Sequence, residues 1–192
     1  MKKIYFLLLV LLLTGCKNDL SPREGDIIFQ TTPRKEAALI HQATLSPISN
    51  CGIVVAKEDE KLYVLTVGNQ VQLIPLDKFI NSGRNHKFCI KRASLPKKAK
   101  IDYEMYLGCS RDIFLRPGDN KFYSAELVYT IFKEQFGIEL CEPQPIKNYH
   151  IEKIIPYLSA HRIHPEQLVV APVDLYNSPK LKTINDTYEK KK

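Results

Sequence analysis

Cysteine and histidine side chains bind metals and act in catalysis, so their spacing is the first place to look for chemistry. The 192-residue chain has five of each. The cysteines lie far apart with no CxxC pair, at Cys16, Cys51, Cys89, Cys109 and Cys141. His161 and His164 stand three residues apart, but no carboxylate or thiol pattern lies beside them. The spacing therefore predicts no metal site, and no motif indicates a cofactor.

The start of the most regular amphipathic segment is a second candidate. Residues 125–136 carry apolar side chains at helical spacing, and Gly137 follows where a glycine commonly ends a helix. Ser124 precedes this segment and Glu126 lies in its first turn. A serine that caps the helix N-terminus, with a glutamate in the first turn, explains both residues without a catalytic role. The same place also suits a nucleophile, because free N–H groups at a helix N-terminus stabilise an anion.

The elements that would position these residues begin after an apolar leader. Two lysines, the ten-residue apolar run 4–13 and then Thr14-Gly15-Cys16 form the pattern of a secretory signal peptide. Leu13-Thr14-Gly15-Cys16 is similar to the lipobox of bacterial lipoproteins, which implies cleavage before Cys16 and lipidation of its thiol. We therefore expect a leader over residues 1–15, a lipid-anchored tether over 16–24 and a single domain over 25–192 with a basic C-terminal tail.

Short β-rich segments and helical segments alternate through the domain. Strands are expected over 26–30, 51–56, 62–67, 71–74, 86–92 and 168–170, and helices over 36–42, 75–80, 96–107, 125–136 and 151–160. Thr32 and Pro33 are predicted as the N-cap and first residue of the first helix. The charged residues 57–60 predict a hairpin turn, and closure around Glu58 would pair Asn50 with Thr66.

The net charge of +7 makes nucleic acid the first partner to consider. The basic runs, at 97–98 and 190–192, are short and have no interleaved aromatic residues. Removing Lys2 and Lys3 with the leader lowers the formal charge from +7 to +5. A solvated face and tail explain this excess, so we expect no nucleic-acid partner, although the tail can lie near anionic lipid.

Four blocks of sequence carry a family resemblance. In chain order they are 25–30 (Gly-Asp-Ile-Ile-Phe-Gln), 43–46 (Ala-Thr-Leu-Ser), 49–54 (Ser-Asn-Cys-Gly-Ile-Val) and 122–128 (Phe-Tyr-Ser-Ala-Glu-Leu-Val). Their order and spacing resemble the permuted papain-like hydrolases, the YiiX-type branch of the NlpC superfamily. The resemblance covers nearly the whole mature chain. It implies an α+β papain-like fold, with a central antiparallel sheet or small barrel and a packed helix that carries the nucleophile position.

The resemblance also implies where catalytic residues would lie. The family places a histidine on one strand, an acidic or polar partner on the next, and a cysteine at a helix N-terminus. The matching positions hold Asn50, Thr66 and Ser124. An amide such as Asn50 accepts no proton at a useful pKa, and a serine hydroxyl needs a base. The resemblance therefore implies that the nucleophile, the base and the residue that orients the base have all been replaced.

Four neighbouring residues are possible pocket residues or substitutes for the base: Gly52, Tyr123, Glu126 and His41. The missing side chain of Gly52 would let the helix or a ligand approach closely. His41 lies on the first predicted helix, where a histidine more often faces solvent. Because side chains alternate along a strand, the Cys51 thiol is expected to point away from the site.

Three functional hypotheses follow. The first is an envelope lipoprotein that has lost hydrolytic chemistry and binds a cell-wall peptide or an acyl- or amide-bearing ligand. The second is an active amidase or ester hydrolase with Ser124 as nucleophile. The third is a structural or partner-binding envelope protein whose cleft is filled by side chains. The oligomeric state stays open.

Overall fold

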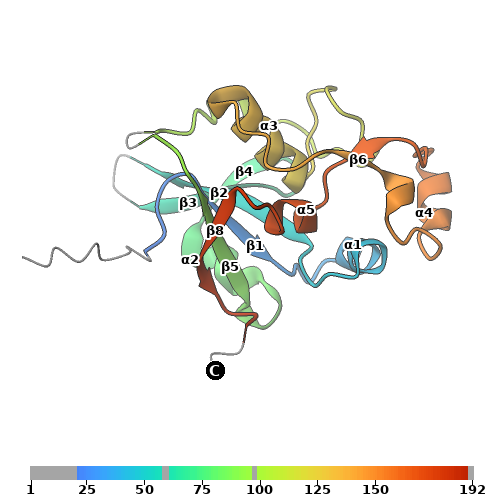
Figure 1. Cartoon of the computed structure of the whole chain (residues 1–192), viewed down its shortest axis with the longest axis horizontal. Helices are drawn as coiled ribbons and strands as arrows, with labels where there is room; N and C mark the ends of the chain where they lie inside the picture. Colours follow the sequence, from blue (N-terminus) through green and yellow to red (C-terminus); the bar gives the residue numbers. More distant parts are fainter. Residues whose placement is uncertain (1–20, 58–60, 97–98, 190–192) are drawn as a thin grey trace, which may run out of the picture.

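The computed structural model describes residues 21–57, 61–96 and 99–189 (Figure 1). The predicted leader, the lipidation site Cys16, most of the tether, the turn residues 58–60 and the lysines at 97–98 and 190–192 lie outside the described residues. Predictions about them stay predictions. Within the described part, no helix combines the length and the apolar character needed to cross a membrane.

Six antiparallel strands form the main sheet. In spatial order they are β4 (Val71–Pro75), β3 (Leu62–Val67), β2 (Asn50–Ala56), β1 (Asp26–Gln30), β5 (Phe88–Ala93) and β8 (Leu181–Asp186). The sheet is open, with β4 and β8 at its edges, so the barrel alternative is wrong and the central antiparallel sheet is confirmed. The mostly exposed strand β8 was missed in the sequence because it has no apolar run.

The helices are α1 (Glu36–Thr44), α2 (Leu76–Ser82), α3 (Ser124–Phe136), α4 (Ile155–Ala160) and α5 (Pro172–Tyr176). Three 3₁₀ turns accompany them, η1 (Arg84–His86), η2 (Glu104–Tyr106) and η3 (Ile146–Asn148). The short strands β6 (Gln144–Pro145) and β7 (Leu168–Val169) pair with each other. Figure 1 shows α3 on one side of the sheet, with α1, α4 and β6 gathered beside one end of it.

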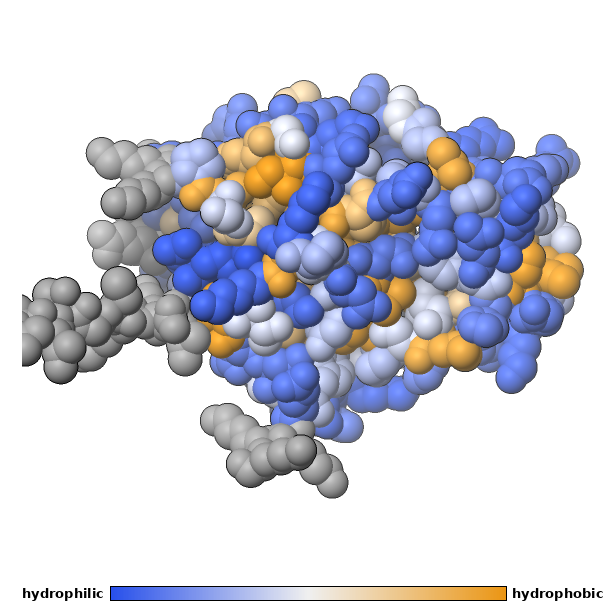
Figure 2. Space-filling model, in the orientation of Figure 1, coloured by the Kyte–Doolittle hydropathy of each residue, from blue (hydrophilic) through white to orange (hydrophobic). Residues whose placement is uncertain are grey.

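Alternating side chains give the sheet two buried faces. Ile27, Phe29, Cys51, Ile53 and Leu65 pack with Leu127, Val128, Ile131 and Phe132 of α3. Ile28, Val54, Val64 and Ile90 pack with Phe79 of α2. A third cluster joins α1, η3, α4 and β7 through Ala43, Ile146, Ile154, Leu158 and Val169. On the face seen in Figure 2, apolar side chains form small separate patches among hydrophilic ones.

Two helix predictions need correction. The first helix begins at Glu36, after the predicted Thr32 and Pro33, because the Thr32 backbone N–H donates to Ser49 Oγ at 3.0 Å and keeps this stretch beside β2. The helix predicted over 96–107 is wrong, and in its described part only η2 forms. Its backbone N–H groups bond to other elements, at Ile101 to Glu24 Oε1 (2.9 Å) and at Asp102 to Gln135 Oε1 (3.0 Å).

The hairpin of β2 and β3 is antiparallel as predicted, but its register differs by two residues. Ile53 lies opposite Leu65, and the same register puts Thr66 opposite Gly52 rather than the predicted Asn50. The turn is closed by a hydrogen bond from the Lys57 N–H to the Lys61 carbonyl, so it is centred one residue later than Glu58. A shift of two residues keeps each side chain on the same face of the sheet.

Candidate functional site

A cavity of about 380 Å³ lies at the end of the main sheet that faces α1 and α4. Its volume is within the usual range of small-ligand sites. Its polar lining includes Gln30, Arg34, Ser49, Asn50, Thr66, Arg111 and Ser124, and its apolar lining includes Leu39, Ile40, Ala43, Ile146, Ile154, Leu158 and Val169. The cavity is therefore amphipathic, with a polar end against the sheet and α3 and an apolar end formed by the third cluster.

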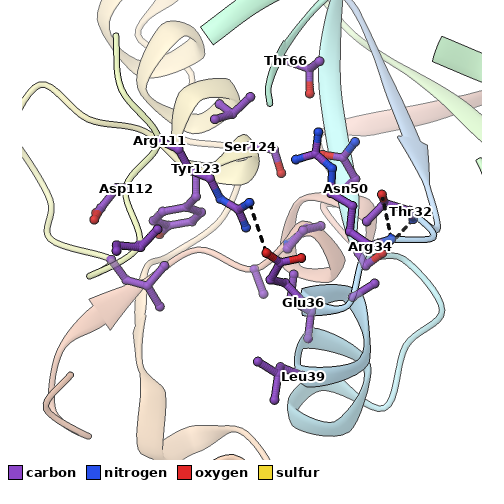
Figure 3. A pocket seen from close by; sticks show the side chains of 18 of the residues that line it. Thr32, Arg34, Glu36, Leu39, Asn50, Thr66, Arg111, Asp112, Tyr123 and Ser124 are labelled. Atoms are coloured by element: carbon purple, nitrogen blue, oxygen red, sulfur yellow. Dashed lines mark hydrogen bonds and ion pairs between the residues drawn. The ribbon is translucent and has the colours of Figure 1, made fainter. Parts of the chain in front are cut away.

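The structure brings three of the sequence-predicted positions to the polar end. Ser124 comes from α3, Asn50 from the first residue of β2 and Thr66 from β3, and all three line the cavity. Tyr123 lines it as well. Figure 3 shows the Ser124 and Asn50 side chains turned toward the same space. The two edges of this space are thus the start of α3 and the start of β2.

Ser124 is the first residue of α3, and Tyr123 takes the N-cap position that was predicted for the serine. The Tyr123 N–H donates to Glu126 Oε2 at 3.4 Å, and the Tyr123 hydroxyl accepts a hydrogen bond from the Val170 N–H at 3.0 Å. The helix end is therefore held by Tyr123 and Glu126. The Ser124 hydroxyl is not used for capping; Ser124 lines the cavity and also contacts the Cys51 thiol.

The Cys51 thiol lies beside this hydroxyl, which corrects the expectation that it points away from the site. Odd-numbered residues of β2 face α3, so Cys51 is in the core beneath the helix with 0% exposure. Burial raises the pKa of this thiol to about 12, a hydrogen bond from Ser124 lowers it, and the nearby Cys141 raises it. Cys51 is therefore a neutral core thiol at physiological pH and no nucleophile.

Thr66 is buried and its hydroxyl donates a hydrogen bond of 2.8 Å to the Cys51 carbonyl. The bond joins β3 to β2 immediately after Asn50. A threonine hydroxyl has one proton to donate, so this proton is not available to orient a neighbouring side chain. The role of Thr66 here is to hold the two strands together at the cavity wall.

The other predicted residues do not line the cavity. His41 is exposed on α1. Gly52 faces its neighbouring strand, since a Cβ there would lie 2.4 Å from Val64 Cγ1 and 2.6 Å from the Leu65 carbonyl, so the predicted close approach of helix or ligand is wrong. Glu126 is buried behind the start of α3. Burial raises its pKa to about 8, opposed by the hydrogen bond from Tyr123.

Charged residues at the cavity were missed by the sequence analysis. Arg34 comes from the segment that leads into α1, Glu36 is the first residue of α1, and Arg111 comes from the connection between η2 and α3. Arg111 Nη1 lies 3.5 Å from Glu36 Oε1 (Figure 3). Neither periodicity nor a local motif marks the two arginines, because both come from irregular segments and the fold alone brings them together.

The histidine pair has local partners. His161 Nδ1 lies 2.9 Å from the Tyr157 carbonyl, and its ring stacks on Tyr157 with centroids 4.0 Å apart. His164 Nδ1 accepts a hydrogen bond from the Glu166 N–H. Over residues 21–57, 61–96 and 99–189, no three His, Cys, Asp or Glu side chains gather closely enough to hold a metal ion.

Comparison with known proteins gives the same family from sequence and structure. A model of the "permuted papain-like amidase enzyme, YaeF/YiiX, C92 family" matches residues 21–185. The uncharacterized protein YiiX of Escherichia coli K12 is 27% identical over 176 residues, which cover 85% of this chain and 86% of that protein. The crystal structure of "metalloprotein yiiX" from Escherichia coli O157:H7 has a TM-score of 0.76 and 26% identity, covering 86% of this chain and 97% of that one. The chain therefore belongs to the YaeF/YiiX, C92 family of permuted papain-like amidases.

Proposed function

We propose that this chain is an exported, lipid-anchored member of the family that binds a cell-wall peptide or an acyl- or amide-bearing ligand and does not hydrolyse it. The observation that carries the proposal is the polar end of the cavity. It is lined by Ser124, Asn50 and Thr66, which stand at the positions where the family resemblance implies a cysteine, a histidine and an acidic or polar partner.

Among the residues that the structure describes, none of the groups considered as a substitute base stands ready to take the Ser124 proton. Asn50 cannot take a proton, the Thr66 hydroxyl donates to a backbone carbonyl, and His41 lies outside the cavity. Loss of general-base catalysis alone slows such reactions about 10²- to 10⁴-fold, and loss of a whole triad on the order of 10⁶-fold. These factors favour ligand binding over turnover.

The shape and lining of the cavity support a ligand with an apolar part. Leu39, Ile40 and Leu158 line its apolar end, where a hydrocarbon chain or an apolar peptide side chain would be removed from water. The polar end offers hydroxyl and amide groups for hydrogen bonds to an amide or acid group. A volume of about 380 Å³ argues against the alternative of a cleft filled by its own side chains.

The relative of known crystal structure is named a metalloprotein, whereas the donor set at the polar end of this cavity does not suit a transition metal. The three predicted positions at the polar end hold a serine, an asparagine and a threonine, and the nearest thiol is buried and neutral. Such neutral oxygen donors, without an imidazole or thiolate, make a poor site for a transition metal. We assign no step of the function to a metal.

Covalent labelling separates this proposal from the active-hydrolase alternative. The full chain is treated with a fluorophosphonate probe, with Ser124→Ala as the matched control. We expect no labelling above the level of the control. Labelling that is lost in Ser124→Ala would show an activated serine and overturn the loss of catalysis.

The proposed anchor has an independent test. Cells that express the full chain are grown with an alkyne-bearing fatty acid, and the wild type is compared with Cys16→Ala. We expect lipid incorporation and membrane association in the wild type and neither in the variant. Equal incorporation in the two proteins would remove Cys16 as the anchor.

A further inference from the structure

Two guanidinium groups face the polar end of the cavity. Arg34 Nη2 lies 3.6 Å from where a Cβ on Gly68 would be, so its guanidinium group is just past the end of β3. Arg111 lies on the other side, at the start of α3. Figure 3 shows both side chains reaching toward the space in front of Ser124 from opposite sides. A ligand atom placed there would have a guanidinium group on each side.

The acidic groups at this end do not neutralise both arginines. The ion pair of Arg111 with Glu36 is 3.5 Å long, and the two side chains are 29% and 44% exposed. Because water screens such a pair, it stabilises the arginine only weakly. Arg34 forms no ion pair with any residue that the structure describes. Asp112 also lines the cavity, but it is buried, its Oδ1 accepts the Phe114 N–H at 2.7 Å, and burial raises its pKa. Arg34 therefore keeps a positive charge at this end of the cavity that no ion pair among the described residues neutralises.

The residues between the arginines are neutral and carry hydrogen-bond donors. A thiolate at position 124 would repel an anionic ligand, and the hydroxyl of Ser124 does not. The amide of Asn50 adds two N–H donors, and α3 directs its partial positive end at the same space. An arginine side chain matches a carboxylate geometrically through two parallel hydrogen bonds.

From this arrangement we propose that the polar end binds a free carboxylate, so that the ligand is an acyl chain or apolar segment ending in an acid rather than in an amide. The inference rests on the proposed function and narrows its ligand class. The carboxylate lies between Arg34 and Arg111 in front of Ser124, and the chain extends past Leu39 toward Leu158. Amide hydrolysis by a family enzyme would produce a carboxylic acid at this position. The cavity of this chain would thus bind the product of that reaction rather than its amide substrate.

Decanoate and decanamide form a matched pair of probes, because they share one chain and differ in charge. Binding of each to the full chain is measured by titration calorimetry, for the wild type, Arg34→Gln and Arg111→Gln. Lys35→Gln is the control, since it removes a charge of the same sign from an exposed neighbour that does not line the cavity. Loss of charge-assisted hydrogen bonds costs roughly ten- to a hundredfold in affinity.

We expect the wild type and Lys35→Gln to bind decanoate at least about tenfold more tightly than decanamide, and either arginine substitution to remove that preference. Equal affinities for the two probes, or a preference that survives both substitutions, would overturn the carboxylate site and leave the proposed acyl-binding cavity intact. No binding of either probe would overturn the inference together with the acyl ligand of the proposed function. Arg34 is exposed and without an ion-pair partner in the described part, so Arg34→Gln keeps the test valid if Arg111→Gln does not fold.

Discussion

The buried carboxyl of Glu126 at the start of α3 makes the stability of this protein depend on pH. Its pKa is raised from 4.5 to about 8, mainly by burial. Between these two values the folded protein holds a proton that the unfolded chain releases. Folding therefore becomes less favourable as pH rises from about 4.5 to about 8, and the whole penalty is present above that range. At pH 5 the penalty is nearly absent.

The substitution Glu126→Gln removes this ionisation and keeps an oxygen that can accept the Tyr123 N–H. A shift from 4.5 to about 8 corresponds to at most about 5 kcal/mol, and partial access of water reduces the expected effect to about 2–3 kcal/mol. We expect the variant and the wild type to have similar free energies of unfolding at pH 5. At pH 9 the variant should be more stable by that amount.

Urea unfolding at pH 5, 7 and 9 measures the effect as a change in the midpoint at constant slope. Glu152→Gln is the control, because Glu152 is exposed and its substitution should shift the midpoint little at any of the three pH values. The reasoning is refuted if the difference between Glu126→Gln and the wild type is the same at pH 5 and pH 9.

Three further predictions concern the sheet and the core. Asp26→Asn should lower the free energy of unfolding by about 3–5 kcal/mol in urea, because Asp26 is 1% exposed and pairs with Arg92 Nε at 2.6 Å; a loss below about 1 kcal/mol would contradict a structural role for the pair. Gly52→Ala should cost about 1–3 kcal/mol in the same assay, since its Cβ would overlap Val64 and the Leu65 carbonyl, and an unchanged midpoint would argue against that packing. In the folded protein iodoacetamide should alkylate the partly exposed Cys109 well before Cys51, as followed by peptide mass spectrometry, and comparable rates would show that the core beneath α3 opens.

The sequence predicts the residues that regular elements position. Ser124 follows from the amphipathic pattern of α3, and Asn50 from the β-rich run that became β2. The sequence does not predict which face of β2 is covered by α3. The whole strand is apolar or small after Asn50, so no polar alternation marks an outer face, and the Cys51 thiol was assigned to the wrong side.

The remaining errors share a physical cause, which is that irregular segments take their conformation from tertiary contacts. The segment after β5 resembles a helix locally, but the N–H groups of Ile101 and Asp102 bond to side chains of Glu24 and Gln135. Arg34 and Arg111 reach the cavity from segments with no periodicity. The positions of these two arginines, on which the proposed carboxylate site rests, could therefore not be predicted from sequence patterns.

The walls of the cavity are held by bonds that do not involve the side chains of Asn50, Thr66 or Ser124. The Tyr123 hydroxyl accepts the Val170 N–H, and Asp174 accepts hydrogen bonds from the Ala171 N–H and the Tyr149 hydroxyl. The first bond fixes the start of α3 against the segment that leads into α5, and the other two fix Ala171 and Tyr149 to α5; all three would persist with other side chains at positions 50 and 124. The proposed loss of the catalytic groups therefore need not collapse the cavity. The double substitution Ser124→Cys with Asn50→His should fold with an unfolding midpoint close to that of the wild type, and gain of ester or amide hydrolysis in this variant, absent from Ser124→Cys alone, would show that only the catalytic groups are missing. A folded double variant that hydrolyses no ester or amide would contradict a retained catalytic geometry.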